Sequence, residues 1–144
     1  MIKICKCKSW LILILWLIFS SNNALAGWIG IGRAKDGMGK FYLDSSTIKR
    51  NGNKVTVWVL TDFKHPQNTI AGLKSYSSYK WKLEADCRKS ESRYLGFDVF
   101  SNSMGRGTVL LTNDDALESR PIPVGSIIKV ISEYACKKAI KISR

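Results

Sequence analysis

The sequence is poor in the residues on which most enzymes and metal proteins depend. Its 144 residues contain one histidine, three prolines, and 11 acidic residues against 23 basic ones. The lone His65 precedes Pro66 in a polar stretch, where we expect an exposed loop. Even with the two cysteines that follow the N-terminal segment, it does not reach the four ligands of a structural zinc site. We therefore predict no catalytic residue, no metal site and no cofactor.

Loops that bind nucleotide phosphates are also missing. The segment Gly37–Lys40 resembles part of a phosphate-binding loop, but Phe41 stands where Ser or Thr should hold magnesium. Ala34 stands where the first glycine of that loop should be. The pair Gly30 and Gly32 lacks the third glycine and the following helix of a dinucleotide site. These absences exclude the common nucleotide-dependent enzymes.

The chain has a single long apolar run, Trp10–Phe19, and its 10 residues are too few to cross a bilayer, which takes about 20. The segment closes with Ala24 and Ala26, two small residues spaced as in the A-x-A pattern that signal peptidase cleaves. The residues before the run are basic: Lys3, Lys6 and Lys8. We therefore predict that residues 1–26 are a cleavable signal peptide, with an uncleaved anchor as the alternative. No transmembrane segment is expected after cleavage.

The remaining residues 27–144 form one domain of 118 residues, because no linker, repeat or low-complexity stretch divides them. Without the three lysines of the signal, 20 basic residues face 11 acidic ones, a net charge of +9. Such a charge favours anionic partners. For an exported protein these are lipopolysaccharide phosphates, acidic glycans or acidic host proteins, and not nucleic acid. A solvated basic surface without a partner is the alternative.

Cleavage of the signal leaves two cysteines, Cys87 and Cys136. In an oxidising compartment they are expected to form one disulfide, so no free thiol remains as a nucleophile. The bridge closes a loop of about 50 residues, for which the chain-entropy model gives roughly 4 kcal/mol.

Most of the domain has the pattern of β-strands. In Lys80–Cys87 apolar and charged residues alternate, which predicts that Trp81 and Leu83 face a core while Glu84 belongs to a solvated ion-pair ladder with the lysines. Trp58 lies in a strand that is apolar on both faces, and we expect it to be buried as well. Residues 63–73 should be a loop. The predicted strands span residues 28–33, 40–44, 54–63, 75–87, 93–100 and 108–112.

The end of the domain has helical periodicity. Ser126 is a plausible N-cap, and Ile127, Val130, Ile131 and Tyr134 should share one apolar face. The sequence therefore predicts an α+β fold: a single antiparallel β-sheet of about six strands, a C-terminal helix packed on it, and one disulfide that ties the end of the helix to the sheet.

Four cations lie after the last cysteine: Lys137, Lys138, Lys141 and Arg144. We expect them in an exposed, mobile tail beyond the disulfide. Because no acid lies among them, they are the candidate ligand-binding residues, for sulfated glycans, phosphorylated lipid heads or host proteins. A tail that only adds solubility is the alternative.

Several spaced motifs give the mature chain a resemblance to the surface-adhesin protein E family. These motifs are Phe41–Asp44, Val57–Phe63, Glu84–Cys87, Phe100–Gly107, Pro123–Ser126 and the final Cys136. The resemblance covers nearly all of residues 27–137. It implies an antiparallel sheet with a C-terminal helix held by a disulfide, as the residues predict on their own.

The resemblance also implies a function. The family's namesake is an adhesin at a Gram-negative cell surface that binds host extracellular matrix proteins and plasminogen and forms homodimers. The lipid anchor of the namesake is not expected here, because Gly27 and not a cysteine follows the predicted cleavage site. We therefore expect an exported, non-enzymatic binding protein at the outer cell surface or secreted. The alternative is a periplasmic structural or stress protein with no host ligand.

Overall fold

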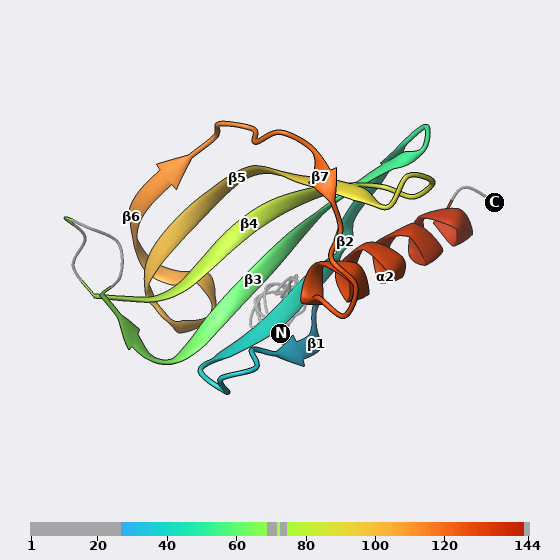
Figure 1. Ribbon diagram of the computed structural model, residues 1–144. Coiled ribbons are helices and arrows are strands. Elements are labelled where there is room, and N and C mark those ends of the chain that lie inside the picture. The colour runs from blue at the N-terminus through green and yellow to red at the C-terminus, as the bar shows by residue number, and fades with distance from the viewer. Residues whose placement is uncertain (1–26, 69–71, 73–74, 143–144) are drawn as a thin grey trace, which may run out of the picture.

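The computed structural model describes residues 27–68, 72 and 75–142, so the expected signal peptide and Arg144 lie outside it. The described chain forms strands, one short 3-10 turn and one helix (Figure 1). The elements in order are β1 (Trp28–Arg33), β2 (Gly39–Asn51), β3 (Lys54–Gln67), β4 (Tyr76–Asp86), β5 (Glu91–Asn102), η1 (Ser103–Gly105), β6 (Arg106–Asn113), β7 (Arg120–Pro121) and α2 (Ile127–Ile142).

The strands form one antiparallel sheet whose spatial order, β1-β2-β3-β4-β5-β6, follows the chain. Short connections make this order, because consecutive antiparallel strands need only a hairpin turn between them. The two-residue strand β7 pairs with the start of β5. Figure 1 shows one curved sheet with α2 lying against one of its faces. The predicted fold class is confirmed, and β7 is an addition to it.

Four strands, β2, β3, β5 and β6, are longer than the sequence predicts. The segment β2 continues through a register shift after Asp44, and β3 runs to Gln67, so the prediction of a loop from residue 63 is wrong for its first part. His65 and Pro66 therefore lie in a strand. The regular pairing of β3 with β4 ends at Asp62 and resumes only at Gln67, and this irregular stretch tolerates a proline that cannot donate to the ladder.

The core lies between α2 and the face of the sheet that we call the core face. Period-2 alternation brings Trp81, Leu83 and Ala85 to this face, where they are 3%, 0% and 1% exposed, as predicted. From the helix, Ile131 and Ala135 are fully buried against them. Other core members come from β2, β3 and the helix: Leu43, Ile48, Val55, Val57, Val59 and Ala139.

One burial prediction is wrong, and another holds on an unexpected face of the sheet. Val130 is 48% exposed, because the buried stripe of the helix is centred on Ile131, Ala135 and Ala139, each four residues apart. The small alanines let the helix lie close to the sheet and leave Val130 at the side. Trp58 is partly buried, but it lies on the face opposite the core, since it pairs with Lys82 and not with a core-face residue.

The helix begins as predicted. The backbone N–H of Lys129 donates to Ser126 Oγ at 3.2 Å, and that hydroxyl donates to the carbonyl of Pro123 at 2.7 Å. The predicted disulfide between Cys87 and Cys136 is present, with the Cα atoms 5.8 Å apart. It joins the helix at its tenth residue, however, and not at its end. Among the described residues, no helix is both long enough and apolar enough to span a membrane.

Candidate binding surface

Two hairpins and the last turns of the helix meet at one end of the molecule (Figure 1). Lys54, at the start of β3, is in register with Asp86 at the end of β4. The next residue, Cys87, donates its backbone N–H to the carbonyl of Asn53 at 2.9 Å and is bonded through sulfur to Cys136. The β2–β3 turn, the β4–β5 turn and α2 are therefore fixed side by side.

This end of the molecule carries a concentration of cations, which we call the basic end. Its members are Lys49 and Arg50 of β2, Lys54 of β3, Arg88 and Lys89 of the β4–β5 turn, and Lys137, Lys138 and Lys141 of α2. All eight are exposed. Charges that are spread along the sequence thus come together at one end of the molecule when the chain folds.

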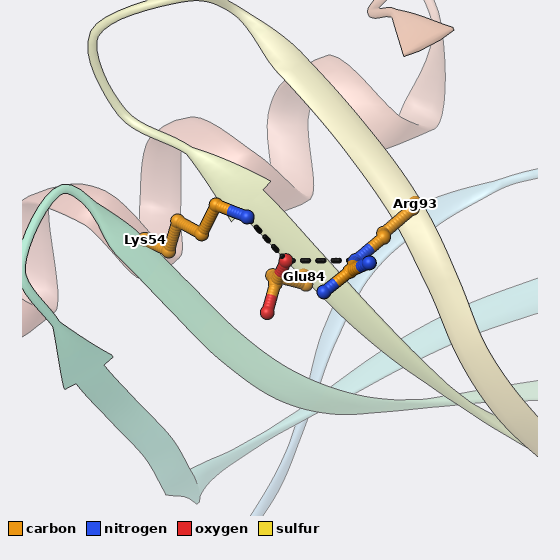
Figure 2. Close-up of polar contacts among 3 residues, drawn as sticks. All are labelled: Lys54, Glu84 and Arg93. Carbon is orange, nitrogen blue, oxygen red and sulfur yellow. Dashed lines mark hydrogen bonds and ion pairs between the residues drawn. The ribbon is translucent and has the colours of Figure 1, made fainter. Parts of the chain in front are cut away.

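One carboxylate within the sheet neutralises part of this charge. Glu84 Oε1 accepts hydrogen bonds from Lys54 Nζ at 3.1 Å and from Arg93 Nε at 2.8 Å (Figure 2). Partial burial raises the pKa of Glu84, but the hydrogen bonds and charges of Lys54 and Arg93 together outweigh burial and lower it. Among the described residues, the other seven members of the basic end make no ion pair with a carboxylate.

The prediction that Glu84 forms ion pairs with lysines of its own strand, β4, is wrong. Glu84 pairs with residues on the two neighbouring strands, and not with Lys82 on its own strand. Directly opposed residues on adjacent strands lie closer together than residues two apart along one strand. Arg93 is the register partner of Glu84, which gives this pair its short distance.

Asp86 holds the β4–β5 turn in shape. Its Oδ1 accepts the backbone N–H groups of Arg88 at 2.9 Å and Lys89 at 3.0 Å. These hydrogen bonds lower the pKa of Asp86, and the nearby charges of Lys89 and Lys54 add to the effect. The carboxylate thus binds backbone groups, and the side chains of Arg88 and Lys89 remain exposed.

The predicted ligand-binding lysines lie in a different setting from the one expected. Lys137, Lys138 and Lys141 are exposed, but they belong to α2 and not to a mobile tail. Residues three and four apart share one side of a helix, so Lys141 lies next to both of the others. Arg144 lies outside the described residues.

The cations of the two hairpins were not among the binding residues predicted from sequence. Arg88 directly follows Cys87, and Arg50 precedes the predicted turn at Gly52. Because the predicted disulfide already placed Cys87 beside Cys136, the positions of Arg88 and Lys89 near the helix lysines followed from it. The β2–β3 hairpin joins them only through the register of β3 with β4, which the sequence does not reveal. Among the described residues, no three His, Cys, Asp or Glu side chains gather where they could hold a metal ion.

Comparisons with known proteins identify relatives by sequence and by structure. A sequence model of the family described as surface-adhesin protein E matches residues 28–137. A search of curated proteins finds no match. A solved structure of Haemophilus influenzae protein E has a TM-score of 0.62 at 12% identity, covering 83% of this chain and 90% of that one. Protein E from non-typeable Haemophilus influenzae has a TM-score of 0.57 at 13% identity, covering 81% and 79%.

Proposed function

The chain belongs to the surface-adhesin protein E family, and we propose that it is an exported binding protein that holds acidic macromolecules through its basic end. The observation that carries this proposal is the convergence of eight exposed cations from four segments at one end of the molecule. Their backbone positions are fixed by the sheet and by the Cys87–Cys136 bond. A rigid cationic surface binds a polyanion with less loss of conformational entropy than a flexible tail.

Sulfated glycans and acidic segments of host matrix proteins carry the matching charge. Further support comes from the seven members other than Lys54, which make no ion pair among the described residues, since a cation without a bonded carboxylate keeps more of its attraction for an external anion. We include plasminogen among the proposed partners because the family resemblance implies it. Binding at such a surface involves no bond cleavage, and we propose no enzymatic activity for the chain.

We also propose that the protein acts at the outer cell surface. A signal peptide at residues 1–26 and display at the outer surface agree with membership of an adhesin family. A periplasmic structural or stress role is the second candidate, favoured by Gly27 at the predicted cleavage site, where a lipid-anchored protein has cysteine. Protease treatment of intact cells separates the two. Degradation on intact cells supports the adhesin, and release only by osmotic shock supports the periplasmic role.

Binding itself is tested with the mature protein on three immobilised polymers. We expect retention on sulfated heparin, weaker retention on carboxylated hyaluronan and none on neutral dextran. Salt should release the protein, because exposed ion pairs are screened within about 10 Å at 0.1 M ionic strength. Failure to bind heparin at low salt, or retention that salt does not change, contradicts the proposal.

A further inference from the structure

A hollow lies on the part of the core face that α2 leaves uncovered. The helix packs mainly against β2 and β3, and the segment between β6 and β7 runs along the outer edge of β5, beside the uncovered part of the face. Leu117 of this segment donates its backbone N–H to the carbonyl of Tyr94 at 2.9 Å. The hollow beside this segment has a volume of about 440 Å³, within the range of small-molecule sites.

Aromatic side chains form most of the wall. Tyr79, Trp81, Tyr94 and Phe97 line the hollow, with Leu117 among the other lining residues. Trp81 is 3% exposed and is fixed by a hydrogen bond from Nε1 to Thr61 Oγ1 at 3.1 Å. Its ring centroid lies 5.0 Å from that of Tyr94, which is 36% exposed. One ring is therefore anchored in the core while its neighbour is open to a ligand.

The charge at this hollow is opposite to that of the basic end. Asp115 is the charged residue of the lining, and among the described residues neither lysine nor arginine lines the hollow. The backbone N–H of Asp115 donates to Asn113 Oδ1 at 2.7 Å, which holds the turn at the rim. The exposed Asp114 precedes it on the same segment, and its Oδ1 lies near Gly96, another lining residue. A negative rim above aromatic rings is complementary to a cation.

We infer that this hollow binds an organic ammonium cation, of the trimethylammonium type found in choline. Aromatic faces attract cations that lie within about 6 Å of the ring centre, and the attraction grows when water is excluded. The methyl groups of a quaternary ammonium can also pack against the apolar walls. The carboxylate of Asp115 attracts the positive charge, and a neutral ligand gains nothing from this attraction. The inference goes beyond the proposed function, which concerns polyanions at the basic end.

The test compares choline with its uncharged isostere 3,3-dimethylbutanol, which has the same shape without the charge. Each is titrated into the mature protein while the NMR signals of the Trp81 indole and the Tyr94 ring are followed. We expect choline to shift these signals and the isostere to bind about tenfold more weakly. Equal binding of the two makes the hollow a neutral apolar site and overturns the inference, as does the absence of a choline-dependent shift.

Two variants locate the site. Asp115→Asn removes the charge at the rim, and Tyr94→Leu removes the exposed ring; each should weaken choline binding several-fold. Glu133→Gln is the matched control, because it removes one exposed carboxylate on α2 and should leave binding unchanged. Should Tyr94→Leu fail to fold, Asp115→Asn decides, since among the described residues the Asp115 carboxylate accepts one long side-chain hydrogen bond, at 3.5 Å. Unchanged choline binding in Asp115→Asn overturns the assignment.

Discussion

Cys136 lies in the middle of α2 and is bonded to Cys87 at a Cα–Cα distance of 5.8 Å, so that the helix continues for six residues past the bond. This extension carries Lys137, Lys138 and Lys141 beside the turn that holds Arg88. The disulfide thus fixes two groups of cations relative to each other. Its removal affects both stability and the layout of the basic end.

The first prediction concerns this bond. Mass spectrometry of the non-reduced mature protein should show one linked peptide pair, and Cys87→Ser or Cys136→Ser should lower the free energy of unfolding by about 2–5 kcal/mol. Urea denaturation of each single variant and of the double variant measures the loss. The double variant should lose no more than either single one, because all three lack the same bond. Two free thiols in material from the periplasm contradict the prediction.

The second prediction separates two tryptophans on opposite faces of the sheet. Trp81 is 3% exposed and packs in the core, whereas Trp58 is half-buried on the other face. Trp81→Leu should cost about 3 kcal/mol through lost burial and a lost hydrogen bond, and Trp58→Leu clearly less. Iodide should quench the Trp58 fluorescence more readily than that of Trp81. Equal quenching would mean that iodide reaches the two tryptophans equally well, and this would contradict the structure.

A third prediction rests on Gly96, whose backbone has φ +151. A Cβ at this position lies 2.7 Å from the carbonyl oxygen of Asn113, a backbone atom that cannot move aside cheaply. Gly96→Ala should therefore destabilise the protein by about 2–3 kcal/mol. Gly37 is the matched control, because it also has positive φ but has open space around it. Gly37→Ala should cost about 1 kcal/mol, and a larger loss there than at Gly96 contradicts the account.

The fourth prediction concerns acid stability. The folded state lowers the pKa of Glu84 below its ordinary value of 4.5, so this carboxylate stabilises the protein above that pH and loses its effect as pH falls through the folded-state pKa. Glu84→Gln should cost about 1 kcal/mol at pH 7, since Lys54 is half exposed. The cost should shrink between about pH 5 and 3. Glu118→Gln is the control, because it removes an exposed carboxylate. If the cost of Glu84→Gln does not vary with pH, the charges of Lys54 and Arg93 do not stabilise the protein through Glu84.

Local sequence patterns predicted the parts of the fold that depend on near neighbours. Period-2 alternation placed Trp81 and Leu83 on the core face, and Ser126 marked the start of the helix. The extra lengths of β2 and β3 were missed because register shifts let strands continue past a proline and a polar run. The exposure of Val130 depends on which side of the helix meets the sheet, a tertiary property.

The binding surfaces were predicted only in part for the same reason. Lys137, Lys138 and Lys141 were identified as candidates because they are close together in sequence. Arg50 and Arg88 join them only through strand register and the disulfide. The aromatic hollow needs Leu117 to lie beside Tyr94 at the edge of β5, a contact between distant segments that no short-range pattern predicts.

The central claim is that the basic end is the site that holds polyanions, and two triple variants examine it. One replaces the helix cations (Lys137→Gln, Lys138→Gln and Lys141→Gln), and the other the turn cations (Arg50→Gln, Arg88→Gln and Lys89→Gln). The control replaces three exposed lysines at the opposite end of the β2–β3 pair (Lys35→Gln, Lys40→Gln and Lys64→Gln). All three proteins have the same net charge, so any difference between them reflects the position of the charge and not its amount.

The measurement is the salt concentration at which each protein elutes from heparin, taken with the melting temperature to show that it is folded. We expect both basic-end variants to elute at clearly lower salt than the control, because the lost cations belong to one surface. The control should elute close to the unaltered protein. Equal shifts in all three variants mean that heparin senses only net charge, and that result contradicts a binding site at the basic end.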